Sequence, residues 1–273
     1  MKSRMLKKTL LLSTLIFSMH FCKVSAQIGV SFKNGHSHND YHQPIPLLNS
    51  YHARMGSIEA DVFLKNGQLY VAHDSTEITK DATLRKLYLE PLAEKYVKNG
   101  HSPYPDPAQK LQLVIDIKKD YQLVLPVLIE ELKSFNTIFD KTKNPKAITI
   151  AISGDMPLPS AFKNYPEYIS FDGRPNIEYT PLQLKRVVMI SADIKKYTTW
   201  NGRGTLTTAD KLKLKSVIEK AHKQQKPFRF WGTADGPETW LELKKLGVDW
   251  INTDQPERLQ NFYQQGASRP QQN

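Results

Sequence analysis

Two acidic residues, Glu59 and Asp61, stand two positions apart in the otherwise apolar segment 57–63. Alternate residues of a β-strand point to the same face, so the two carboxylates point together while their apolar neighbours face the opposite layer. Carboxylates directed into one space repel each other unless a cation lies between them, and a sulfur-free oxygen site suits Mg²⁺ or Ca²⁺. The alternative is an exposed strand with ordinary surface acids.

A second pair two positions apart, Asp116 and Lys118, lies in the apolar run 113–118. Asp116 is a candidate third oxygen ligand of the cation, and Lys118 would supply a fixed positive charge for a phosphate oxygen. A buried Asp/Lys ion pair without a ligand is the competing interpretation.

Histidines complete the set of candidates. His36, His38 and Asp40 lie within five residues, in a segment expected to follow a strand directly, where a hydrogen-bonded turn is the structural alternative. His73 follows an Asn-Gly hairpin turn at residues 66–67. A two-residue loop places His73 opposite Ala60, whereas one bulged residue places it opposite Asp61; both registers return it to the acidic pair, and the sequence does not choose between them.

The elements that position these residues alternate along the chain. Helical spacing of apolar residues is found at 84–97, 121–135, 209–224 and 237–246. Eight short β-type runs occur at 30–32, 57–64, 111–117, 147–152, 168–171, 187–190, 228–231 and 250–252. This alternation predicts an α/β fold with a single closed (β/α)₈ TIM barrel, with a doubly wound open sheet as the fallback. No G-x-G-x-x-G follows a strand, which disfavours a dinucleotide site.

The first 26 residues have a basic start, a short apolar run and a small-residue end at Ala26, and they predict a signal peptide. A lipid anchor on Cys22 is the alternative, disfavoured by the bulky residues before it. Cleavage near Ala26 would leave a cysteine-free, soluble chain and a secreted or periplasmic location. The expected organisation is a signal peptide at 1–26, one barrel domain at 27–265 and a polar tail at 266–273.

The formal charge of +11 would fall to +6 without the five basic residues of the first 26, a surplus that suits anionic substrates or surfaces. No compact basic run with interleaved aromatic residues is present, so nucleic acid is not an expected partner. Membrane contact is expected to be peripheral at most.

The ordered set resembles the glycerophosphodiester phosphodiesterase and phospholipase-C-like superfamily. In that superfamily a first histidine, an E-x-D pair, a His-Asp and an acidic-x-Lys occur in the order seen at His36, Glu59/Asp61, His73/Asp74 and Asp116/Lys118. Phe230-Trp231-Gly232-Thr233 is similar to its late tryptophan strand, and 247–256 is similar to its closing Gly-x-Asp-x-x-x-Thr-Asp-x-Pro.

Departures from that pattern concern the first motif. The chain has His36-Ser37-His38 where glycerophosphodiesterases have His-Arg-Gly, lacks their Pro-Glu-Asn glutamate, and has Asp116 where they usually have Glu. The run from His38 to Tyr41 is most similar to the domain of altered inheritance of mitochondria protein 6, and Gly-His-x-x-Asn, ending at Asn39, is similar to sphingomyelinase D toxins.

The resemblance implies a phosphodiesterase that acts on a small-molecule or lipid phosphodiester. It implies one divalent metal ion, Mg²⁺ or Ca²⁺, held by Glu59, Asp61 and Asp116, with His36 and His73 as the catalytic acid–base pair. Cleavage by a neighbouring substrate hydroxyl would give a cyclic phosphate. The remaining assignments are substrate contacts at Lys118, Trp231 and Asn39.

Two other functions were weighed. His36-x-His38 is also how amidohydrolase barrels begin a zinc site, but such barrels need later histidines, and after position 73 only His101 and His222 remain. A protein that binds phosphate esters without cleaving them is the other alternative.

Overall fold

The computed structural model describes residues 33–267, with the side chains of the last two left out. Its strands are β1 Gly35–Ser37, β2 Ser57–Lys65, β3 Gln68–Val71, β4 Gln112–Ile117, β5 Thr149–Gly154, β6 Ile169–Gly173, β7 Val187–Asp193, β8 Phe228–Trp231 and β9 Trp250–Thr253. All of them pair in parallel except β3, which forms an antiparallel hairpin with β2. Pairing of β1 with both β9 and β2 closes the ring. The predicted eight-stranded barrel is therefore confirmed.

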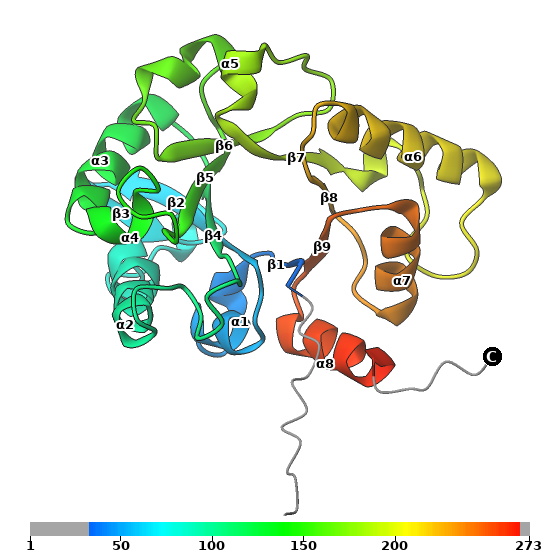
Figure 1. Cartoon of the computed structure of the whole chain (residues 1–273), viewed down its shortest axis with the longest axis horizontal. Helices are drawn as coiled ribbons and strands as arrows, with labels where there is room; N and C mark the ends of the chain where they lie inside the picture. The colour runs from blue at the N-terminus through cyan, green and yellow to red at the C-terminus, as the bar shows by residue number, and fades with distance from the viewer. Residues whose placement is uncertain (1–32, 268–273) are drawn as a thin grey trace, which may run out of the picture.

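Helices surround the strands (Figure 1). The α-helices are α1 Leu48–His52, α2 Glu90–Lys98, α3 Tyr121–Lys133, α4 Asn136–Phe139, α5 Pro181–Leu184, α6 Thr208–Lys223, α7 Pro237–Leu246 and α8 Pro256–Ala267. Short 3₁₀ segments lie at Asp40–His42, Ser75–Glu77, Pro159–Asn164 and Ile194–Lys196. No helix within residues 33–267 is both long and apolar enough to cross a membrane.

Local sequence explains where the helices begin and end. The Thr207 hydroxyl accepts a hydrogen bond from the Asp210 backbone N–H at the start of α6, and Gly247, with φ of 96°, ends α7. The helix predicted at 84–97 differs: a π-helical turn, Arg85–Leu89, precedes α2. Pro91 lacks a backbone N–H and removes one α-helical hydrogen bond at that junction.

The first strand departs from the sequence prediction. The run 30–32 expected to form it lies outside the described residues, and β1 is instead Gly35–Ser37, so His36 belongs to the strand rather than to the loop after it. The whole predicted signal peptide and most of the predicted tail likewise lie outside the described residues.

Strand alternation separates two environments. Ile58, Ala60 and Val62 of β2 are fully buried in the main apolar core between strands and helices. A smaller apolar cluster, Val114, Ala151 and Met189, is contributed by β4, β5 and β7. The polar site described below is built at the ends of the strands where active sites of this barrel type lie.

Candidate active site

The three predicted metal ligands lie together. Glu59 and Asp61 share one face of β2, and Asp61 is the register partner of Asp116 on the neighbouring strand β4. One oxygen from each carboxylate lies within 4.8 Å of the others. Pairing of β2 with β4 therefore brings together side chains more than fifty positions apart in the chain.

The contacts of Asp61 test whether these residues fit a metal ion. Its Oδ2 accepts hydrogen bonds from the Tyr41 hydroxyl at 2.8 Å and from Lys118 Nζ at 2.6 Å. Its Oδ1 is buried and has no hydrogen-bond partner among the described residues. A buried carboxylate oxygen without a partner is costly, and a hard cation would satisfy it. The all-oxygen cluster is compatible with a divalent metal.

Electrostatics in the cluster point the same way. Burial, together with the nearby Glu59 carboxylate, raises the pKa of Asp116 to about 6 even though Lys118 opposes this shift. Burial also disfavours ionisation of Glu59, but the Arg229 guanidinium outweighs it and holds the pKa of Glu59 well below its usual range. The neighbouring negative charge therefore disfavours the ionised form of Asp116, and a divalent cation beside the three carboxylates would relieve this repulsion.

Lys118 links the two aspartates. Its ammonium lies 2.6 Å from Asp61 Oδ2 and 3.4 Å from Asp116 Oδ1, and about a quarter of its side chain is exposed to the cavity described below. The ion pair weighed as a structural alternative is therefore present, and it coexists with access to the cavity.

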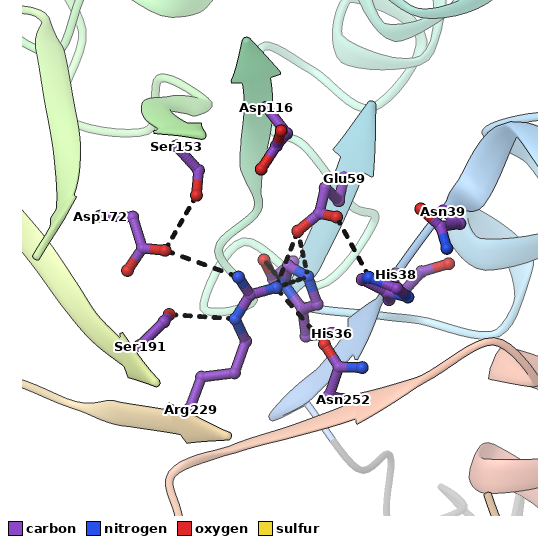
Figure 2. Close-up of polar contacts among 12 residues, drawn as sticks. His36, His38, Asn39, Glu59, Asp116, Ser153, Asp172, Ser191, Arg229 and Asn252 are labelled. Carbon is purple, nitrogen blue, oxygen red and sulfur yellow. Dashed lines mark hydrogen bonds and ion pairs between the residues drawn. The ribbon is translucent and has the colours of Figure 1, made fainter. Parts of the chain in front are cut away.

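Arg229, which the sequence analysis did not single out, is the buried cation of the site. Figure 2 shows its guanidinium among Glu59, His36, Asp172, Ser191 and Asn252. Its Nη1 donates to Glu59 Oε2 at 2.8 Å, its Nε donates to Ser191 Oγ at 3.0 Å, and its Nη2 lies 3.5 Å from Asp172 Oδ2. The sequence signal was a lone charge between Phe228 and Phe230 in a buried strand.

His36 lies beneath the cavity rather than on its wall. It is fully buried, and burial together with Arg229 lowers its pKa to about 3, so the ring is neutral near pH 7. Arg229 Nη1 donates to its Nε2, which leaves Nδ1–H to donate to Ser57 Oγ at 2.6 Å. The predicted catalytic residue thus lies under the acidic cluster: Arg229 Nη1 contacts both its Nε2 and Glu59 Oε2, two acceptor atoms 3.0 Å apart.

His38 is the histidine of the first segment that lines the cavity. Its Nδ1 lies 2.8 Å from Asp254 Oδ1, and its Nε2 lies 3.7 Å from Glu59 Oε1. Burial alone would lower its pKa, but the hydrogen bond to Asp254 and the charge of Glu59 outweigh burial and raise it. Neighbouring Asn39, also on the cavity wall, has a left-handed backbone with φ of 45°, which asparagine tolerates.

His73 approaches the cluster from the other side. The β2–β3 register pairs Val62 with Val71, as a two-residue turn requires, and β3 ends there. His73 therefore follows the strand, with Nδ1 3.4 Å from Asp61 Oδ2 and 3.2 Å from the Tyr41 hydroxyl oxygen. More than half of its side chain is exposed, so its other ring nitrogen is accessible.

A cavity of about 410 Å³ joins these groups. The cavity is lined by His38, Asn39, Glu59, His73, Asp116, Lys118, Ser153, Gly154, Arg174, Arg229, Trp231 and Gly232. Trp231, at the end of β8, is 38% exposed. Three larger hollows, of about 430, 660 and 760 Å³, hold none of the predicted site residues. The cavity of about 410 Å³ is lined by every predicted site residue except His36 and Asp61. Asp61 is buried beside it.

Comparisons with known proteins find related chains. The model of the AIM6-like phosphodiesterase domain matches residues 25–172. A protein of Arthroderma benhamiae named altered inheritance of mitochondria protein 6 homolog is 28% identical over 84% of this chain and 83% of its own. Altered inheritance of mitochondria protein 6 of Eremothecium gossypii is 26% identical over 83% of this chain and 68% of its own.

A solved structure described as glycerophosphodiester phosphodiesterase from Agrobacterium tumefaciens covers 84% of this chain and 97% of its own. Its TM-score is 0.47 at 13% sequence identity, a likeness too low to argue from.

The expected secreted or periplasmic location is wrong, because the names of the curated relatives point elsewhere. The curated relatives are fungal proteins, and their names refer to the inheritance of mitochondria rather than to secretion. The amino-terminal pattern that suggested export is short and compositional, and it lies in the part of the chain that the structure does not describe.

Proposed function

Because the chain belongs to the family of AIM6-like phosphodiesterase domains, we propose that it is an enzyme that cleaves a phosphodiester with the help of one divalent metal ion. The observation that carries this proposal is the cluster of Glu59, Asp61 and Asp116, with one oxygen from each within 4.8 Å, beside a cavity lined by two histidines.

Three carboxylates would hold the ion, with Mg²⁺ and Ca²⁺ as the candidates because every ligand is a hard oxygen. When bound, the ion would neutralise charge on the phosphate oxygens. The partnerless Oδ1 of Asp61 supports this set of ligands. Lys118 adds a second positive charge at the same end of the cavity and would contact a phosphate oxygen.

His38 and His73 are the proposed proton-transfer pair. Both line the cavity, and both have one ring nitrogen oriented by a polar neighbour, Asp254 for His38 and Tyr41 for His73. The raised pKa of His38 favours its protonated form, so His38 gives a proton to the leaving oxygen, and His73 takes one from the attacking oxygen. His36 is then a positioning residue that accepts a hydrogen bond from Arg229, which in turn donates to Glu59.

The substrate is proposed to be a small-molecule or lipid phosphodiester, bound between the metal ligands and the indole of Trp231. Asn39, on the same wall as His38, would contact it as well. The cavity size is typical of small-ligand sites, and membrane contact would be peripheral.

Hydrolysis of bis(4-nitrophenyl) phosphate by the purified protein tests this proposal. Activity should require Mg²⁺ or Ca²⁺ and should disappear with a chelator. His38→Ala and His73→Ala should each lower kcat by about 10²- to 10⁴-fold, the usual range for a general acid or base, while metal binding is retained. His52→Ala, an exposed histidine in α1, is the matched control.

Near-normal turnover in the His38 or His73 variant would contradict the assignment of that residue. Metal-dependent binding of phosphate esters without any turnover would instead support the non-catalytic alternative. A phosphorus NMR time course on a substrate with a neighbouring hydroxyl distinguishes attack by that hydroxyl, which gives a cyclic phosphate, from direct attack by water.

A zinc hydrolase of the amidohydrolase type is not favoured. Within residues 33–267, the group suited to a metal contains three carboxylates and no histidine. Zinc sites in proteins are typically built with histidine or cysteine ligands.

A further inference from the structure

The cavity has a second positively charged wall that the proposed chemistry does not use. Lys118 contacts the metal-binding aspartates and belongs to their end of the cavity. Arg174 follows β6, which is separated from β4 by one strand, β5. Two strand spacings place the backbones of β4 and β6 about 10 Å apart.

Arg174 is anchored through one nitrogen. Its Nη1 lies 3.1 Å from Asp172 Oδ2 and donates to the carbonyl oxygens of Asp172 and Gly173, at 3.0 and 3.1 Å. Its Nε and Nη2 have no hydrogen-bond partner among the described residues, and the side chain is 31% exposed where it lines the cavity. The guanidinium is therefore fixed in place through Nη1, while the N–H groups of Nε and Nη2 can donate to a ligand.

The charge of Arg174 is only partly balanced. The same Oδ2 of Asp172 lies 3.5 Å from Arg229 and accepts a hydrogen bond from Ser153. Arg229 also forms an ion pair with Glu59, a proposed metal ligand. Two guanidinium groups thus share the Asp172 carboxylate, so Arg174 has no carboxylate partner of its own among the described residues.

The floor between the two charged ends is uncharged. It consists of Ser153 and Gly154 at the end of β5, and the exposed indole of Trp231 also lines the cavity. A ligand that spans the cavity would therefore meet cationic groups at both ends and neutral surface between them.

We propose that Arg174 is a specificity residue for a second anionic group of the substrate, a phosphate monoester or a carboxylate carried on the alcohol away from the scissile bond. This inference rests on the proposed phosphodiesterase function. A guanidinium binds such groups through paired N–H donors, and its charge-assisted hydrogen bonds are the strong kind.

Two synthetic diesters that release the same 4-nitrophenolate test the inference. One carries a plain butyl alcohol and the other a butyl chain that ends in a phosphate or carboxylate. The wild-type protein should prefer the doubly anionic ester in kcat/KM, mainly through KM, by about 10- to 100-fold. Arg174→Gln should bring the ratio close to one, and Arg174→Lys should retain part of the preference.

Lys119→Gln is the matched control, because Lys119 is an exposed cation one position beyond Lys118 and does not line the cavity. It should leave the wild-type preference unchanged. Thermal unfolding and metal titration of each variant verify that the fold and the metal cluster persist.

Three outcomes would overturn the inference in distinguishable ways. Equal losses on both esters in Arg174→Gln would mean that Arg174 only positions Asp172. Hydrolysis of both esters at equal efficiency by the wild-type protein would remove the second anion site and leave the phosphodiesterase proposal standing. Failure to hydrolyse either ester with metal present would refute the proposed function and the inference with it.

Discussion

Individual side chains of the site differ sharply in environment even when they are close in sequence. His36 and His38 are two positions apart, yet burial and Arg229 lower the pKa of His36 to about 3, whereas Asp254 and Glu59 raise the pKa of His38 despite its burial. The first ring is a neutral hydrogen-bonding group under the cluster. The second ring lines the cavity, and its protonated form is favoured.

The neutral state of His36 predicts acid sensitivity. Its pKa falls from 6.5 in the unfolded chain to about 3 in the fold, so the unfolded state binds one more proton between these values. The stability associated with neutral His36 is complete above pH 6.5 and is lost as the pH falls toward 3. Between pH 6 and 4, wild type should lose about 1.4 kcal/mol per pH unit more than His36→Gln.

Urea unfolding at several pH values measures this difference. His52→Gln, which removes an exposed histidine, should follow the wild-type slope. Parallel slopes for wild type and His36→Gln would show that His36 titrates normally in the folded protein.

The strands position these side chains in two ways: successive side chains alternate between the two faces, and neighbouring strands approach each other closely. β5 ends at Gly154, whose φ is +71°. A Cβ at this position would overlap the carbonyl oxygen of Ile117 and Oδ1 of Asp116 on the neighbouring strand. Glycine therefore leaves room for a proposed metal ligand.

Gly154→Ala should lower the free energy of unfolding by about 2–4 kcal/mol, since left-handed strain and steric overlap add together. It should also weaken metal binding by displacing Asp116. Gly67→Ala is the control, because Gly67 has a similar φ of +75° but no atom within 4 Å of its would-be Cβ. That control should cost only about 1–2 kcal/mol and leave metal affinity intact. Equal costs in the two variants, measured by urea unfolding and metal titration, would exclude crowding at Gly154.

At the scale of the whole molecule, barrel closure assembles the site from both ends of the chain. Arg229 contacts His36 across 193 positions, and Asp254 contacts His38 across 216. The family match ends at residue 172, so Arg229, Trp231 and Asp254 come from the part of the chain beyond it. Stability of the barrel and assembly of the site are therefore linked.

Divalent metal should stabilise the whole barrel, because the proposed carboxylate site exists in the folded protein and not in the unfolded chain. At 100 times the dissociation constant the gain is about 2.7 kcal/mol, or roughly 5–10 °C in Tm for a domain of this size. The shift should be smaller at pH 5 than at pH 7.5, because protonation of Asp116, with its pKa of about 6, competes with metal.

Asp61→Asn should abolish the metal-induced shift in a thermal unfolding experiment, whereas Asp81→Asn, at an exposed acid, should retain it. A wild-type Tm that does not respond to Mg²⁺ or Ca²⁺ at either pH would contradict the metal site.

The sequence alone determined the barrel, the family and the acidic cluster, because these depend on local patterns. Alternation within β2 fixes the shared face of Glu59 and Asp61, and the Asn-Gly turn sets a register that returns His73 to them. The order of strands and helices then specifies the fold class.

Tertiary structure decided which histidine faces the cavity and which cations surround the cluster. Burial of His36, partial exposure of His38 and the placement of Arg229 depend on β1 lying between β2 and β9 and on β8 pairing with β9. These are contacts between distant segments, and no spacing within one segment encodes them. Arg174 was missed for the same reason, because only the strand order brings the end of β6 to the cavity that the acidic cluster lines.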